Sequence, residues 1–157
     1  MRKRIAMLGV MAVVLAMTAG AGAQAKNPRF GKWKLKQDAG LNIMTYEPFG
    51  ANGMKVTVES SSPTGGKSKW WYTTDFDGKD MPVTGQAPGQ TSAVTKVNDQ
   101  ISIITNKRDG KVTQVLYNIL SKDQNSIGVM YYRDDGSGKT TNITFAMYER
   151  MTEKSEK

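Results

Sequence analysis

The feature that most constrains the fold is a regular return of turn-forming residues along most of the chain. Glycines, often preceded by Asn, Asp or another Gly, recur roughly every 10 to 14 residues. Asn-Gly and Asp-Gly suit tight hairpins because both central residues of a type I′ turn need positive φ. Short segments separated by such turns are typical of an antiparallel sandwich or barrel. The turn positions are Asn52-Gly53, Gly65-Gly66, Asp77-Gly78, Gly89, Asn98-Asp99, Asp109-Gly110, Asp123-Gln124-Asn125 and Asp135-Gly136.

The segments between these turns have the residue pattern of strands. Segment 54–60 places Val56 and Val58 on one face and polar residues on the other, which is the period of a half-buried strand. Segments 68–76 and 101–106 alternate in the same way. Segments 112–120, 127–133 and 140–148 are rich in β-branched and aromatic residues, but they carry apolar residues on both faces, so their inward side stays open.

No segment after residue 25 sustains a helical period over 11 residues or more. Consecutive hairpins with short loops form a meander, and an open meander leaves two exposed strand edges. Closure into an up-and-down barrel removes both edges. We therefore predict an all-β fold: an antiparallel up-and-down meander barrel of eight to ten strands.

The first 25 residues have the three parts of a secretory signal. Arg2, Lys3 and Arg4 precede an apolar run of about 14 residues, and small residues follow up to Ala25. That run is shorter than the roughly 20 residues a membrane-spanning helix needs. We expect residues 1–25 to be a signal peptide cleaved after Ala25, residues 26–157 to be a single β-barrel domain, and the product to be periplasmic or secreted without a membrane span.

The composition excludes several classes of function. The chain has no His and no Cys, which rules out Ser-His-Asp and Cys-His catalysis and imidazole or thiolate metal sites. The lysines and arginines are scattered singly rather than clustered, so no nucleic-acid surface is expected. Asp75, Asp77 and Asp80 could chelate a hard cation, but their spacing lacks a calcium-loop pattern. We expect no catalytic residues, no metal and no cofactor; acid–base catalysis by carboxylates and tyrosine is the one enzymatic alternative that the composition leaves open.

Three short motifs resemble one superfamily. Gly31-Lys32-Trp33-Lys34-Leu35 resembles the G-x-W motif that opens the first strand of lipocalins and fatty-acid-binding proteins. Tyr148-Glu149-Arg150 resembles the closing strand of the same superfamily, the calycins, and residues 72–85 resemble a hairpin of bacterial exported lipocalin-like proteins. The similarity covers roughly residues 30–150. It implies a structural barrel closure by Gly31, Trp33 and Arg150, with Trp33 under the barrel floor and Arg150 across it.

The chain departs from fatty-acid-binding proteins at two points. Those proteins insert a helix-turn-helix lid after the first strand, whereas only residues 37–40 separate the first two expected strands here. Their last strand also carries an arginine, two residues before the tyrosine, that holds the fatty-acid carboxylate. Ala146 stands at that position. The resemblance therefore implies a barrel without the lid and without that carboxylate-binding mechanism.

Two functions follow from this fold class. The first is a non-enzymatic binding protein that holds a small apolar or amphipathic ligand in its interior, because aromatic residues lining a barrel can contact such a molecule. The second is a structural or interaction protein of the cell envelope, whose barrel is filled by side chains and whose outer surface, including Trp71, does the work. The candidate ligand-lining residues are Trp70, Tyr72, Phe76, Ile103 and Tyr148.

Overall fold

The computed structural model describes residues 27–36, 40–134, 137 and 139–152. The expected signal peptide, residues 1–25, and part of the turn at 135–138 lie outside the described residues. Within them the chain forms strands and no helix. The strands are β1 (Gly31–Leu35), β2 (Leu41–Phe49), β3 (Gly53–Ser61), β4 (Lys67–Thr74), β5 (Met81–Pro82), β6 (Gln90–Lys96), β7 (Ile101–Arg108), β8 (Lys111–Leu120), β9 (Ser126–Asp134) and β10 (Thr140–Arg150).

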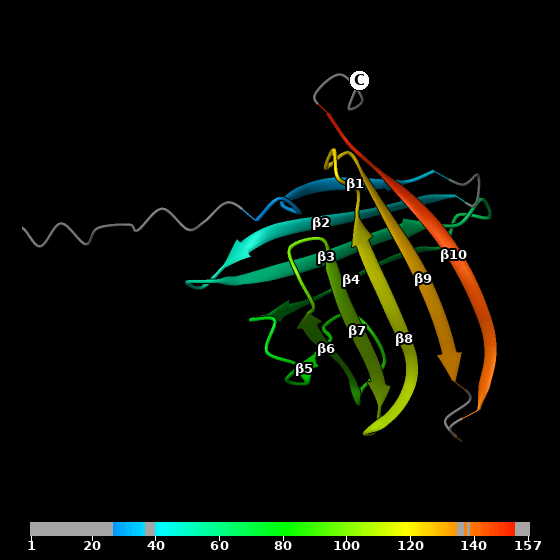
Figure 1. Cartoon of the computed structure of the whole chain (residues 1–157). Coiled ribbons are helices and arrows are strands. Elements are labelled where there is room, and N and C mark those ends of the chain that lie inside the picture. Colours follow the sequence, from blue (N-terminus) through cyan, green and yellow to red (C-terminus); the bar gives the residue numbers. More distant parts are fainter. Residues whose placement is uncertain (1–26, 37–39, 135–136, 138, 153–157) are drawn as a thin grey trace, which may run out of the picture.

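All ten strands belong to one antiparallel sheet in the order β4-β3-β2-β1-β10-β9-β8-β7-β6-β5. Neighbours in the sheet are neighbours in the chain except where β1 meets β10. There Trp33 pairs with Arg150 and Leu35 with Tyr148, so the first and last strands join. The sheet wraps into a nearly closed barrel (Figure 1). The predicted up-and-down barrel is confirmed, with ten strands.

The seam of the barrel lies between β4 and the short β5. The amide of Trp71 donates to the carbonyl of Thr84, and the amide of Thr84 donates to the carbonyl of Trp71, both at 2.9 Å. The exposed Trp71 ring is covered in part by the Lys55 ammonium, 4.8 Å from the ring centroid. Trp71 therefore packs at the point where the two ends of the sheet come together.

Several hairpin turns form where the glycine pattern predicted them, whereas Asp77-Gly78 lies in the connection between β4 and β5, which are not neighbours in the strand order. Between β7 and β8, Asp109 and Gly110 have φ angles of 50° and 77°, as both central residues of a type I′ turn require. The strands follow the predicted alternation: Val56 and Val58 of β3 are buried, whereas Glu59 points outward and pairs with Lys69 of β4 at 2.6 Å. Burying an aliphatic side chain of this size contributes about 1.5–3 kcal/mol.

Trp33 and Arg150 close one end of the barrel. The Trp33 ring is fully buried, and the Arg150 guanidinium lies over it, 4.1 Å from the ring centroid. Arg150 also donates to the backbone carbonyls of Phe30 and Pro28 at 2.9 and 2.6 Å. Gly31 sits beneath this arginine at a φ of 127°, and a Cβ there would lie 3.1 Å from Nη1 of Arg150. The structure thus brings together the three residues of the expected closure.

A second arginine, Arg29, crosses the same closed end and is almost fully buried. Its two terminal nitrogens donate to the carbonyls of Asp99 and Gln100 at 2.7 and 2.6 Å. Its own carbonyl accepts a hydrogen bond from Nε1 of Trp33 at 2.8 Å. Burial lowers the pKa of Arg29 from its ordinary value. The residue ties the segment before β1 to the β6–β7 turn and to the floor tryptophan.

Candidate functional site

The barrel encloses a cavity of about 660 Å³. It extends from the middle of the barrel to the end opposite Trp33, and residues from nine of the ten strands line it. Ligand pockets in proteins are commonly about 300–1,000 Å³ and mostly apolar with a few convergent polar groups. The interior is therefore hollow, and its volume is in the range of a small-molecule site.

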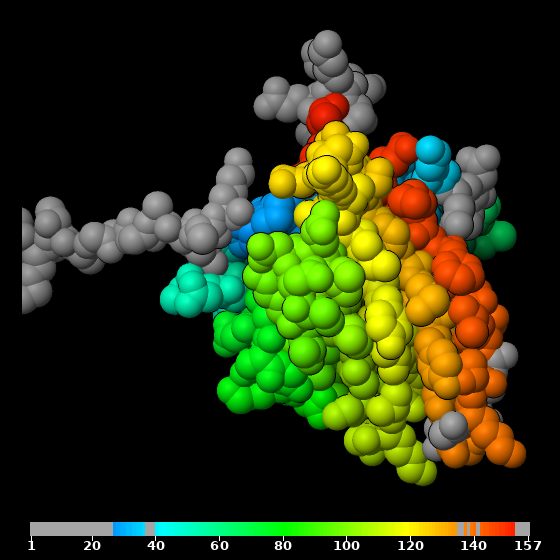
Figure 2. Space-filling view, in the orientation of Figure 1, coloured from blue at the N-terminus to red at the C-terminus, as the bar shows by residue number. Residues whose placement is uncertain are grey.

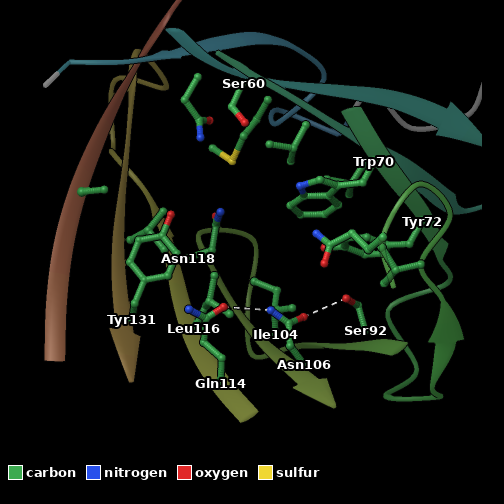
Figure 3. Close-up of a pocket in the computed structure, with 18 of the residues that line it drawn as sticks. Ser60, Trp70, Tyr72, Ser92, Ile104, Asn106, Gln114, Leu116, Asn118 and Tyr131 are labelled. Atoms are coloured by element: carbon green, nitrogen blue, oxygen red, sulfur yellow. Dashed lines mark hydrogen bonds between the residues drawn. The ribbon is translucent and has the colours of Figure 1, made fainter. Parts of the chain in front are cut away.

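The deeper wall of the cavity is apolar and aromatic. Trp70 and Tyr72 of β4 lie nearly parallel, with ring centroids 6.2 Å apart and planes inclined by 13°. Tyr131 of β9 lies on the opposite wall (Figure 3). The aliphatic residues between them come from β9 and four further strands, and they are Leu35, Val56, Val58, Ile104, Leu116 and Val129. This wall can cover the flat or aliphatic part of a ligand.

Hydroxyl and amide side chains line the wall near the open end. Ser92 Oγ donates to Oδ1 of Asn106 at 2.7 Å, and Nδ2 of Asn106 donates to Oε1 of Gln114 at 3.0 Å (Figure 3). In this series of hydrogen bonds Gln114 accepts through Oε1, so its amide nitrogen can donate a hydrogen bond to a ligand. Gln86 and Gln90 lie on the same part of the lining. All five groups are uncharged, so these side chains can both donate and accept hydrogen bonds without adding a charge to the lining.

Asn42 of β2 adds a polar atom that the protein does not satisfy. Its Oδ1 is buried and has no hydrogen-bond partner among the described residues, while the side chain lines the cavity. Buried polar atoms are nearly always hydrogen-bonded, since an unpaired one costs about 1–3 kcal/mol. Asn42 is therefore placed to accept a hydrogen bond from a molecule inside the barrel.

Charges are few around the cavity. No aspartate or glutamate is found among its described lining residues, and the two cations that border it are Lys107 and Arg133. Lys107 is paired with Asp80 at 2.8 Å, and Arg133 also has an interaction partner. Burial raises the pKa of Tyr46 to about 12 and also raises the pKa of Tyr148, whose hydroxyl lies 3.1 Å from that of Tyr131. These phenols stay neutral at physiological pH and add to the uncharged hydrogen-bonding groups.

Three of the five residues proposed as ligand-lining border this cavity: Trp70, Tyr72 and Tyr148. Phe76 does not. The strand ends at Thr74, and Phe76 has a φ of 61°, so the alternation of β4 does not extend to it. Phe76 instead lines a separate cavity of about 20 Å³.

The assignment of Ile103 is wrong. Its neighbours Ser102 and Ile104 are buried, Ile104 lines the cavity, and Ile103 faces outward beside Thr95 and Tyr117. The inner face of β7 carries Ser102 and Asn106 together with Ile104. Because this inner face is partly polar, the more apolar face of the strand was not the inward one.

The inner faces of the last three strands are now defined. Apart from Tyr148, sequence reasoning missed the lining residues on these strands, and it also missed the asparagines, because polar residues at inward positions look like solvent-facing ones. The inward residues that border the cavity are Gln114, Leu116 and Asn118 of β8, Val129, Tyr131 and Arg133 of β9, and Thr144, Ala146 and Tyr148 of β10. Both faces of these three strands carry apolar residues, so the sequence alone did not show which face points inward.

The aspartates of the β4–β5 connection are engaged by lysines. Asp77 pairs with Lys79 at 2.6 Å, which lowers the pKa of Asp77, and Asp80 pairs with Lys107. Among the described residues, no three His, Cys, Asp or Glu side chains gather where they could hold a metal ion. No helix in the described part of the chain is long and apolar enough to cross a membrane.

Ten antiparallel strands that wrap around a hollow interior, with a tryptophan and an arginine at the floor, define the fold as a lipocalin and fatty-acid-binding-protein-like barrel. Solved structures of the fluorescent protein UnaG share it. A UnaG mutant matches with a TM-score of 0.56 at 17% identity, over 80% of this chain and 98% of that chain. Wild-type UnaG matches with a TM-score of 0.55 at 16% identity, over 78% and 96%.

Identity at this level shows the shared fold alone. No sequence pattern of a known protein family matches the chain, and no curated protein matches it. The function therefore has to be argued from the cavity itself.

Proposed function

We propose that the protein is an exported carrier that binds a small amphipathic molecule inside its barrel and acts by binding rather than by catalysis. The observation that supports this most is the cavity of about 660 Å³ with an apolar, aromatic depth and a polar open end. A ligand with an apolar body and one hydrogen-bonding end matches both parts. A barrel filled by side chains, the other function considered, would leave no space of this size.

The polar end of the ligand is proposed to be uncharged. The open end offers Asn106, Gln114 and the buried acceptor of Asn42, and these groups pair with amides, hydroxyls or similar groups. Of the two cations on the lining, Lys107 is already paired with Asp80 and Arg133 also has an interaction partner. Ala146 leaves no guanidinium at the position where fatty-acid-binding proteins hold a carboxylate. An uncharged group with both donors and acceptors is the better match.

Export is proposed from the sequence of the first 25 residues. Their basic start, apolar run and small-residue end have the order of a cleavable signal. A carrier outside the cytoplasm would keep an apolar molecule away from water between two sites. The cavity needs no disulfide to hold its shape, and the chain contains no cysteine.

The test uses the protein purified after expression of the full chain. Native mass spectrometry reports any co-purifying molecule. Thermal unfolding is then measured with dodecanamide, dodecanoic acid and dodecane, which share a tail and differ at the end. A ligand at a concentration about 100 times its Kd stabilises the folded state by about 2.7 kcal/mol. Dodecanamide should therefore raise Tm by several degrees, and by more than the acid does.

A blocked cavity provides the specificity control. Leu116→Trp places a large side chain in the lining and should abolish the shift. Val97→Trp changes an exposed residue outside the cavity and should leave it unchanged. The absence of any co-purifying molecule, together with no shift from any of the three probes, would show that the barrel is not a carrier of this kind.

A further inference from the structure

The outer face of β8, β9 and β10 is apolar over its central part. Figure 2 shows these three strands side by side on one side of the molecule. The exposed fractions are 45% for Ile119, 52% for Ile143, 68% for Phe145 and 44% for Met147. From this face we propose that two copies of the chain form a dimer by packing their β8–β10 surfaces against each other.

The register of the strands gives this surface a projection and a hollow of its own. Gly128 of β9 lies between Ile119 of β8 and Met147 of β10, and a Cβ added to Gly128 would meet nothing within 4 Å. Phe145, two residues from Met147 on β10, is the most exposed large apolar residue of the surface. The hollow and the projection are therefore one strand and two residues apart.

A two-fold axis between these two points makes the surface complementary to itself. In an isologous dimer each patch contacts the same patch of the other copy. With an axis midway between Phe145 and Gly128, the phenyl ring of each copy fills the hollow over Gly128 in the other. Glycine inside a strand often marks a place where another backbone or side chain approaches closely. The contact between Phe145 and Gly128 occurs twice in the dimer, so one substitution at either residue disrupts both copies of it.

Charge favours a second copy over other occupants. The outward residues of β8–β10 from Tyr117 to Ile119, Gly128 to Tyr132 and Ile143 to Met147 include no charged side chain. Without Arg2, Lys3 and Arg4 of the expected signal peptide, residues 26–157 carry a formal charge of about +5, so two copies repel each other. Two such copies approach each other with the least electrostatic repulsion at a surface that carries no charged side chain. An acidic protein or an anionic membrane would instead be recognised by lysines and arginines on the surface.

The area is that of an interface core. Strands lie about 4.8 Å apart and outward residues of one strand about 6.8 Å apart, so three strands by three outward rows cover about 300 Å² of flat surface. Ile103 of β7, which pairs with Tyr117, extends it by one strand. A stable interface buries roughly 800 Å² on each partner, with an apolar core inside a polar rim. This surface supplies the core, and the surrounding polar residues supply the rim.

The experiment measures the mass of the protein in solution by sedimentation and by light scattering at micromolar concentrations. The unchanged protein should be a dimer. Phe145→Glu and Gly128→Trp, which remove the projection and fill the hollow, should each weaken dimerisation at least tenfold. Val97→Glu changes an apolar residue that is also more than half exposed but lies off the surface, and it should leave the dimer unchanged. A thermal melt of each variant confirms that it is folded.

Two results would overturn the inference. The first is a failure of the dimer test: the unchanged protein stays monomeric at 100 micromolar, or the dimer persists in Phe145→Glu. The second is a monomer that co-sediments with vesicles of anionic phosphatidylglycerol and loses this binding in Phe145→Glu, which would assign the surface to a membrane. Phe145 also borders the cavity, whereas Gly128 does not, so Gly128→Trp separates a loss of dimerisation from an effect on the interior ligand site.

Discussion

Replacing Ala146 by arginine is expected to change the preference of the cavity from an uncharged to an anionic ligand end. Ala146 lies on the inner face of β10, two residues before Tyr148, and lines the cavity. Fatty-acid-binding proteins, which the sequence resembles, carry a carboxylate-binding arginine at this position. A guanidinium here would lie on the same wall as the hydroxyls of Tyr131 and Tyr148, which are 3.1 Å apart.

The expected size follows from the hydrogen bonds that the new side chain can form. A hydrogen bond to a charged group contributes about 1.5–3 kcal/mol, and 1.4 kcal/mol is about a tenfold change in affinity. One such bond to a carboxylate should tighten acid binding by roughly 10- to 100-fold. The empty variant should be less stable by on the order of 1–3 kcal/mol, because the arginine lies against the apolar Leu116 and Val129 rather than in open water.

The assay is calorimetric titration with dodecanoic acid and dodecanamide. The unchanged protein should bind the amide more tightly, and Ala146→Arg should bind the acid more tightly. Ala146→Gln adds an uncharged side chain of moderate length and should not reverse the order. The inference that the cavity prefers an uncharged ligand end is wrong if the acid binds the unchanged protein as tightly as the amide does. The role of the arginine charge is refuted if Ala146→Gln favours the acid as much as Ala146→Arg.

Three further predictions concern stability. Arg29→Met removes the guanidinium hydrogen bonds to the carbonyls of Asp99 and Gln100 and the longer ones to Asn118, and it should lower the free energy of unfolding in urea by about 3 kcal/mol; a loss under about 1 kcal/mol would contradict the bridging role. The pKa of Tyr46 is raised to about 12 from 10.0, so its stabilisation is complete below pH 10 and is lost as pH rises toward 12. In Tyr46→Phe the pH dependence of unfolding over that window should be shallower by about 1.4 kcal/mol per pH unit, and an unchanged slope would contradict it. Ile104→Ala should lower the free energy of unfolding by roughly 2 kcal/mol and Ile103→Ala by under about 1 kcal/mol. Equal losses in the two variants would refute the inward placement of Ile104.

The fold was predictable because its determinants are local. The hairpin turns need glycine or aspartate at fixed places, and Asp109 and Gly110 adopt the positive φ angles expected of them. The closure of the barrel was predictable from the resemblance of Trp33 and Arg150 to calycin positions, and these two side chains lie in contact. Both features depend on residue types whose physical role changes little from one barrel to another.

The site was harder to predict because the interior of this barrel is partly polar. Alternation of apolar and polar residues identifies the inward face only when that face is the more apolar one. On β7 the inward residues include Ser102 and Asn106, so Ile103 was assigned inward instead of Ile104. The Phe76 assignment failed for a different reason, since the backbone leaves the strand after Thr74.

The ambiguity of the last three strands has a physical cause of its own. On β3 and β4 the outward residues include Lys55, Glu59 and Lys69, and two of these form an ion pair, so the inward face was evident. On β10 the outward Phe145 is as apolar as an inward residue while 68% of it is exposed to solvent. Folding of a single chain gives such a residue little stabilisation, since its surface stays in water. An apolar outer patch on the central part of β8–β10 is therefore better explained by a second molecule that covers it. The residues that obscured the inward face of these strands in the sequence are the ones that form this patch.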